Sequence, residues 1–267
     1  MSSDLLQAAV DPVREAIARR IEESGLNNMH SRRQLLYDGW LLFLSPGKAK
    51  RGRSVNPYFH STRPLDVKIA HCERTYARHG LPVLFRITPF AQPGDLDAAL
   101  AGRGYEAFDT TLVQLLSIDR LPACCVDGDL ELSSPLPESL VDAVGEMRGS
   151  SSSQRAAHLE RLAQTPLEVK ALVARRDGKV VGAGLLSIDD EVAGVFDMIT
   201  ASDAQGQGIG SAIVSRLIAL AWERGVHNVF LQVTASNASA RALYAKFGFS
   251  TLYRYHYRTP ADERRTN

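Results

Sequence analysis

A short glycine-rich segment, Gln205-Gly206-Gln207-Gly208-Ile209-Gly210, stands directly before a stretch of apolar residues at helical spacing. Glycine lets the backbone approach a ligand closely and adopt φ angles that other residues avoid. The first N–H groups of a helix have no partner within the helix, and the helix dipole favours a negative charge beside them. The segment therefore predicts a loop that holds a phosphate or pyrophosphate group.

Two common phosphate loops differ from this segment. A Walker loop would continue as Gly-Lys-Ser/Thr, whereas Gly210 is followed by Ser211 and Ala212. A dinucleotide-binding loop follows the first strand of a βαβ unit and has glycines spaced one residue further apart. The glycines alone thus leave the kind of phosphate ligand open.

A second segment, residues 237–249, narrows the choice. It reads Asn-Ala-Ser-Ala-Arg-Ala-Leu-Tyr-Ala-Lys-Phe-Gly-Phe. Together with Gln205-x-x-Gly208-x-Gly210 it resembles the two signatures of GCN5-related N-acetyltransferases. The resemblance covers roughly residues 129–258. It implies a mixed α/β (α+β) fold, a mostly antiparallel sheet flanked by helices, and direct transfer of an acetyl group from acetyl-CoA to a primary amine in a ternary complex.

The resemblance also implies how the cofactor would be held. The strand before the loop would pair with the pantetheine arm, the loop amides would hold the pyrophosphate, and an asparagine would bind the CoA arm. Asn237 is an equally good helix N-cap. The implied cofactor-binding residues are Met198, Ile199, Thr200, Gln205, Gly206, Gln207, Gly208, Ile209, Gly210, Ser211 and Asn237.

The implied catalytic residues are Tyr244 and Asp197. Tyr244 matches the family's proton donor to the departing thiolate, a role that suits a phenol with a pKa near 10. Asp197 is the one acid among apolar neighbours in its strand, and we expect a base or an amine anchor there. The alternative is a carboxylate that faces solvent or forms an ion pair with Arg175 or Arg176. Some relatives carry a glutamate base where this chain has Gln232, which cannot accept a proton.

Periodicity predicts the elements that position these residues. In the second half, strands are expected at 169–175, 180–188, 192–200, 229–233 and 250–258, and helices at 154–163, 209–225 and 238–247. In the first half, strands are expected at 35–44, 53–56, 83–88 and 110–118, and helices at 3–25, 65–79 and 96–101. Both halves run helix, strand, short helix, strand, at an offset of 144 or 145 residues. We therefore predict two related domains, 1–121 and 129–267, joined by a linker at 122–128.

The first copy lacks the chemistry of the second. In place of the glycine loop it has His60-Ser61-Thr62-Arg63-Pro64-Leu65, and Pro64 removes an N–H donor. Pro93 and Leu100 stand where the second copy has Asn237 and Tyr244. We expect this copy to be degenerate, unable to bind CoA, and to shape the acceptor site or an interface.

The bulk composition is that of a globular protein without a specialised partner. The formal net charge of +1 provides no global field for nucleic acid or membrane, and no apolar run is long enough to span a bilayer. The three cysteines, Cys72, Cys124 and Cys125, form neither a disulfide framework nor a zinc motif. We expect a cytoplasmic monomer or homodimer that uses acetyl-CoA, no metal, and a small-molecule or peptide amine.

Two other functions fit parts of the sequence. A non-catalytic CoA-binding or regulatory module would keep the loop without turnover. A nucleotide-binding oxidoreductase would be protected against heating by ATP or NAD and not by CoA. Thiol release from acetyl-CoA across a panel of amines discriminates these alternatives from an acetyltransferase.

Overall fold

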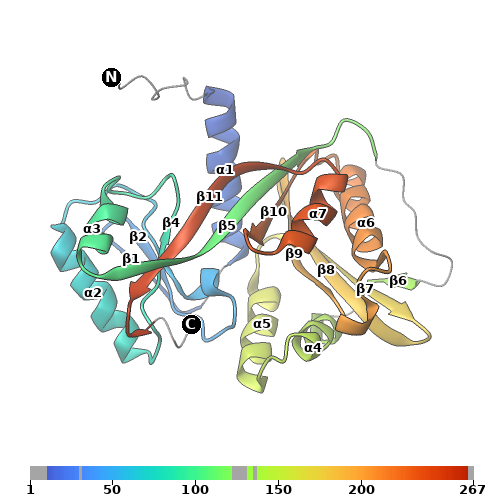
Figure 1. The fold of residues 1–267 in the computed structure, drawn as a ribbon, viewed down its shortest axis with the longest axis horizontal. Helices are drawn as coiled ribbons and strands as arrows, with labels where there is room; N and C mark the ends of the chain where they lie inside the picture. The colour runs from blue at the N-terminus through green and yellow to red at the C-terminus, as the bar shows by residue number, and fades with distance from the viewer. Residues whose placement is uncertain (1–10, 30–31, 122–130, 135–136, 264–267) are drawn as a thin grey trace.

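The computed structural model describes residues 11–29, 32–121, 131–134 and 137–263 (Figure 1). The elements of the first half are α1 (Pro12–Asn28), β1 (Gln34–Tyr37), β2 (Trp40–Phe43), η1 (Lys50–Arg53), β3 (Val55–Asn56), α2 (Leu65–Arg78), β4 (Phe85–Ile87), α3 (Leu96–Gly102) and β5 (Tyr105–Ser117). The linker predicted at 122–128, with Cys124 and Cys125, lies outside the described residues.

The second half contains the glycine loop and the elements around it. They are β6 (Glu131–Ser133), α4 (Pro137–Met147), α5 (Ser152–Gln164), β7 (Glu168–Arg176), β8 (Lys179–Asp189), β9 (Val192–Thr200), η2 (Ser202–Ala204), α6 (Ile209–Glu223), β10 (Asn228–Thr234), α7 (Ala238–Lys246) and β11 (Ser250–Pro260).

One mixed sheet of 11 strands joins both halves, in the order β1-β2-β3-β4-β11-β5-β10-β9-β8-β7-β6. The last strand of each half pairs with the other half. β11 lies between β4 and β5, with Tyr257 opposite Arg86, and β5 pairs with β10, with Leu115 opposite Phe230. The two long strands β5 and β11 cross the middle of the molecule side by side (Figure 1). The halves are thus tied together by backbone hydrogen bonds.

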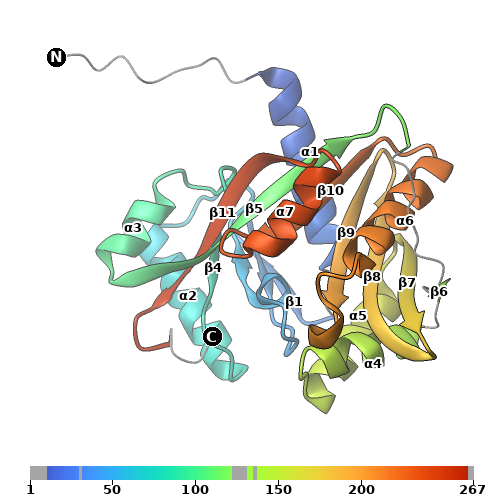
Figure 2. The ribbon, with the colours of Figure 1, turned by 45° about the vertical axis from the view of Figure 1, so that its right-hand side comes forward.

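Helices cover both faces of the second half of this sheet. α6 and α7 lie on one face and α1 lies behind the strands (Figure 2), where α1 and α4 contribute Ile21 and Leu140 to a separate buried cluster. Two glycines of β8 let α6 come close. A Cβ at Gly184 would lie 2.7 Å from Ile213, and one at Gly182 would lie 2.9 Å from Ile209. α6, whose first residue follows the glycine loop, is therefore seated firmly on the sheet.

Most predicted elements are present, and one difference has a clear cause. The strand predicted at 35–44 is a hairpin, β1 and β2, because Asp38 and Gly39 both adopt positive φ, 44° and 82°, in its turn. The second half also contains α4 and β6, which the sequence did not predict. Among the described helices, none combines the length and hydropathy needed to cross a bilayer.

Candidate active site

Strands β9 and β10 pair at one end only. Their parallel ladder runs from Val192–Asn228 to Val195–Leu231 and ends there. Just beyond it, β9 is irregular against β8, and Asp197 has a φ of 54°. Both strands continue past this point, to Thr200 and Thr234, without further pairing between them. The sheet thus opens where the sequence predicts the site.

A cavity of about 580 Å³ lies along the unpaired end of β9, between the glycine loop and α7. It brings together eleven of the thirteen predicted site residues: Met198, Ile199, Thr200, Gln205, Gly206, Gly208, Ile209, Gly210, Ser211, Asn237 and Tyr244. Gln207 and Asp197 are not part of its lining. The side chain of Gln207 instead donates to the Asp203 carbonyl at 3.1 Å and accepts from Arg176.

The glycine loop presents backbone amides to this cavity. Gly206 and Gly208 have φ values of 77° and 80°, and a Cβ on either would meet nothing within 4 Å. The first helical hydrogen bond runs from the Ala212 amide to the Gly208 carbonyl at 3.0 Å, so the three preceding amides lie before the ladder of α6. The chain therefore offers open donors at a helix N-terminus, which fits a phosphate group.

Residues of α7 complete the cavity. Asn237 caps the helix by accepting from the Ala240 amide at 3.1 Å, as its alternative interpretation predicts, and it lines the cavity as well. Lys246 and Ser239 also line the cavity, and the sequence did not predict them as site residues. Lys246 adds a positive charge suited to a phosphorylated ligand.

Tyr244 is buried, 7% exposed, and packs edge-on against Phe249. Burial raises the pKa of its phenol to about 12. The hydroxyl therefore stays protonated throughout the neutral range. It is a persistent hydrogen-bond donor on the wall of the cavity.

Asp197 has different partners from the predicted Arg175 and Arg176. Its carboxylate lies 3.0 Å from Arg148, 2.8 Å from His158 Nε2 and 3.1 Å from Arg161. Burial would raise its pKa, but the hydrogen bond from His158 and the charge of Arg161 together hold that pKa well below the usual range. A carboxylate so strongly stabilised as an anion is a weak base.

Asp197 and His158 line a second cavity, of about 660 Å³, between the halves. One wall is formed by α5, and the opposite wall by the loop 45–49 of the first half. Ser151 caps α5 through the amide of Gln154, with the reciprocal bond also present. Met198 lines the first cavity and the preceding residue, Asp197, lines the second, so both cavities reach β9 at neighbouring residues.

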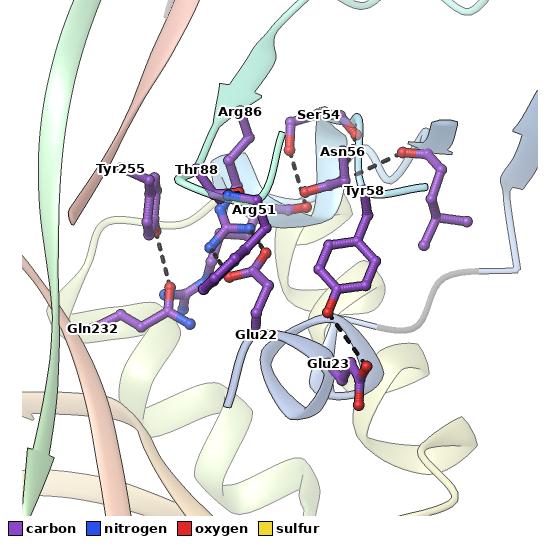
Figure 3. Close-up of polar contacts among 12 residues, drawn as sticks. Glu22, Glu23, Arg51, Ser54, Asn56, Tyr58, Arg86, Thr88, Gln232 and Tyr255 are labelled. Atoms are coloured by element: carbon purple, nitrogen blue, oxygen red, sulfur yellow. Dashed lines mark hydrogen bonds and ion pairs between the residues drawn. The ribbon is translucent and has the colours of Figure 1, made fainter. Parts of the chain in front are cut away.

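Gln232 lies at the open end of β10 in a polar cluster between the halves. Its carbonyl accepts from Arg51 at 2.6 Å and from Tyr255 at 2.9 Å (Figure 3). Close by, Arg86 pairs with the buried carboxylate of Glu22 and lies 3.9 Å from the centre of the Tyr255 ring. The position that carries a glutamate base in some relatives is thus a neutral hydrogen-bond acceptor here.

Comparison with known proteins agrees with this geometry. Residues 140–249 match the model of the acetyltransferase (GNAT) family. An uncharacterized N-acetyltransferase of Bacillus subtilis, YobR, is 29% identical over 82% of this chain and 89% of its own. An IAA acetyltransferase of Azospirillum brasilense is 31% identical over 44% of this chain and 80% of its own. A GCN5-related N-acetyltransferase from Kribbella flavida has the same fold, with a TM-score of 0.67 at 17% identity, over 92% of this chain and 96% of that one.

The chain therefore belongs to the acetyltransferase (GNAT) family. The sequence missed His158, Arg148 and Arg161 as residues of the site. All three come from the segment 148–161, which contains the run of serines and carries no family signature. The sequence signal that could have indicated them was a polar predicted helix, 154–163, together with a single carboxylate, Asp197, on an apolar strand.

Proposed function

We propose that the protein is an acetyl-CoA-dependent N-acetyltransferase that acts on a primary amine by direct attack in a ternary complex. One observation carries the proposal: the open amides of the glycine loop, the unpaired end of β9 and the phenol of Tyr244 line one cavity. The acceptor would approach from the second cavity, which reaches β9 at the residue next to the first cavity.

Each part of the cofactor has a matching group. The free edge at Met198, Ile199 and Thr200 suits the amide-rich pantetheine arm, which would pair with it as a strand does. The amides from Gly206 to Ser211 suit the pyrophosphate. Asn237 accepts the Ala240 amide through its carbonyl, which leaves its NH₂ group free to bind the arm, and Lys246 suits a phosphate.

The chemistry forms a C–N bond and breaks a C–S bond. We assign the base to His158, which uses Nε2 to bond Asp197 and keeps Nδ1 for the amine proton, directly or through water. Asp197 then acts by orienting His158, as a buried carboxylate orients an imidazole in other enzymes. Tyr244 donates a hydrogen bond to the departing sulfur. Its pKa, raised to about 12, lies above that of an alkyl thiol, which makes complete proton transfer to the thiolate unfavourable, so stabilisation of the anion is its main contribution.

The first half supports this site without repeating it. We propose domains 1–121 and 129–267, joined at 122–128, with the first a degenerate copy of the family fold. The order α2–β4–α3–β5 corresponds to α6–β10–α7–β11. The exchange of β5 and β11 between the halves accounts for the single continuous sheet.

The test is thiol release from acetyl-CoA across a panel of amines, with wild type and His158→Gln compared. We expect turnover with wild type, and with the variant a lower kcat and the loss of one ionisation from the pH profile of kcat/KM. Tight CoA binding without turnover on any amine would support a non-catalytic CoA-binding module instead. An unchanged pH profile in the variant would remove His158 from the mechanism.

A further inference from the structure

We infer that the acceptor is a small amine whose other end carries a carboxylate or a phosphate, and that it binds in the cavity between the halves. The inference rests on the proposed function and adds a class of substrate to it. About 660 Å³ is the volume of a small-molecule site. Walls from both halves enclose it, which suits a small molecule better than a protein chain.

The charge around Asp197 is unbalanced. Two arginines, Arg148 and Arg161, share this one carboxylate, and His158 bonds it as well. Even with His158 neutral, the group carries a net positive charge. The side chains of Arg161 and Asp197 are only 14% and 12% exposed, so water screens this surplus weakly. Burial lowers the pKa of Arg161, although the charge of Asp197 acts in the opposite direction.

The rest of the cavity increases the imbalance. Lys48 reaches in from the first half and donates to the Arg148 carbonyl at 2.6 Å. The remaining cationic lining residues are Arg32, Arg33 and Arg155. Besides Asp197, the one acid in the lining is Glu160, whose nearest cation is Arg32 at 3.8 Å. The lining thus holds six Lys and Arg side chains and two acids. Asp142, outside the lining, lies 3.6 Å from Arg155, and the cations around Arg148 and Lys48 remain in excess and attract anions.

The positions of Arg148 and Lys48 suit a ligand that has an anionic group at one end and an amine at the other. Arg148 is 34% exposed and uses Nη1 for Asp197, so the rest of its guanidinium fork remains for a bidentate carboxylate or phosphate. Asp197 and Met198 are consecutive, so this anion site adjoins the proposed place of the thioester. A ligand held by Arg148 and Lys48 at its anionic end would extend its amine toward His158.

The experiment compares matched amines with acetyl-CoA as donor. The pairs are 4-aminobutyrate against butylamine, and phosphoethanolamine against ethanolamine, which separate carboxylate from phosphate recognition. We expect at least a tenfold higher kcat/KM for the anionic member of one pair. Equal or faster turnover of the members without an anionic group would overturn the inference and leave the proposed acetyl transfer standing.

Variants locate the effect. Arg148→Met should reduce the anionic preference about tenfold or more, with the KM for acetyl-CoA unchanged, and Arg148→Glu should favour 1,4-diaminobutane. Arg216→Met is the matched control, because Arg216 pairs with Glu223 on the surface of α6. A preference that survives in Arg148→Met would contradict this site. Arg148 is partly exposed, so the test does not depend on replacing the buried Arg161.

A binding measurement separates this inference from the proposed function. Succinate and phosphate, without acetyl-CoA, should raise the Tm of wild type and of Arg216→Met, and raise it less in Arg148→Met. This result together with no acetyl transfer to any amine would refute the transferase and keep the anion site. No difference between the three proteins would refute the anion site.

Discussion

In each half, three strands are followed by a longer helix, a strand, a short helix and a last strand, yet the segment before the longer helix differs between the halves. In the second half, the segment before α6 lines a cavity of about 580 Å³ with Asn237 beside it. In the first half, the segment before α2 lines a cavity of about 280 Å³, and Pro93 stands in the place of Asn237. The smaller cavity also differs from the larger one in what its loop amides bind.

In the first half, amides of the loop before α2 donate hydrogen bonds to a carboxylate of the same chain. Asp38, in the β1–β2 turn, accepts from the Thr62 amide at 3.1 Å and from the Arg63 amide at 2.9 Å. The buried Lys68 lies 3.2 Å from the same carboxylate, and its ammonium sits 4.0 Å from the centre of the Trp40 ring. The Arg63 amide, first among these groups, lowers the pKa of Asp38. Asp38 thus occupies the position where the second half leaves room for an external anion.

The difference teaches what the glycines accomplish. Both loops present amides to an anion, but the first uses an anion of its own chain. Gly206 and Gly208 keep the second loop free of side chains, with open space where a Cβ would be. The capacity to bind an external phosphate then depends on the open space left by these glycines as much as on the backbone amides that donate to the phosphate.

The test with the largest expected effect places a carboxylate beside the loop amides of the second half, as Asp38 does in the first half. Gly208→Asp places a carboxylate at the N-terminus of α6, where it would compete with the pyrophosphate for the loop amides. Aspartate tolerates the positive φ of 80° at this position better than most residues. We expect the Kd for acetyl-CoA, measured by calorimetry, to rise at least about 100-fold, since a loss of several charge-assisted hydrogen bonds costs about 3 kcal/mol or more.

Gly178→Asp is the matched control. Gly178 has a φ of 74° in the β7–β8 turn, and a Cβ there also meets open space. The same substitution should leave acetyl-CoA binding unchanged. An unaltered Kd in Gly208→Asp would mean that the loop does not hold the pyrophosphate.

Asp197 sharpens the comparison, because the second half has its own internal carboxylate. Asp197→Asn leaves Arg148, Arg161 and His158 around a neutral amide. Removing one partner from such a buried ion cluster costs about 3–5 kcal/mol. We expect the free energy of unfolding at pH 7, from urea titration, to fall by about that much.

The direction of the pKa shift of Asp197 determines how its contribution to the free energy of unfolding changes with pH. Because folding lowers the pKa of Asp197, its stabilisation is complete above the unfolded value of about 3.9 and is lost as the pH falls below it. The difference between wild type and variant should therefore shrink as the pH falls below about 4. Asp190→Asn is the control, since Asp190 is exposed and has a nearly equal φ of 55°. Equal losses in both variants would show that backbone strain, not the cluster, is responsible.

Tyr244 tests the proposed catalytic difference, because Leu100 stands 144 residues before it in the first half. Tyr244→Phe should lower kcat about 10- to 100-fold with little change in the KM for acetyl-CoA, as expected when a donor acts in the transition state. Ionisation of a phenol with a pKa of about 12 should not reduce the wild-type rate below pH 10.

Tyr105→Phe removes a phenol from the first half and serves as the control. Tyr105 bonds Glu73, far along the sheet from the open end of β9, and we expect wild-type kcat. A full wild-type rate in Tyr244→Phe would assign Tyr244 to packing against Phe249.

Local patterns predicted the elements of the second half from α5 onward, because the turns and glycines there mark strand and helix ends clearly. They also predicted most of the residues that line the cavity beside the glycine loop, since these lie in two continuous segments. The exchange of β5 and β11 was not predictable, because pairing between strands distant in sequence leaves no local pattern. For the same reason the sequence placed Asp197 correctly on its strand but missed Arg148, in the loop before α5, and His158 and Arg161, in α5, which all contact it.

The smallest expected effect tests whether Asp38 acts as the internal anion of the first half. Asp38→Gly removes the carboxylate and keeps a residue that adopts the turn's φ of 44° without strain. We expect Tm at pH 7 to fall by a few degrees and kcat/KM to stay at the wild-type level. Because the pKa of Asp38 is lowered on folding, the loss of stability should disappear as the pH falls below about 3.9. The amides of Thr62 and Arg63, left with Lys68, should then bind an added anion, so phosphate or acetate should restore Tm in this variant.

Asp177→Gly changes the corresponding Asp-Gly turn of the second half, where Asp177 is exposed, and phosphate should not affect it specifically. If neither anion rescued Asp38→Gly beyond this control, the first half would have lost its anion site altogether, and Asp38 would be a turn residue only.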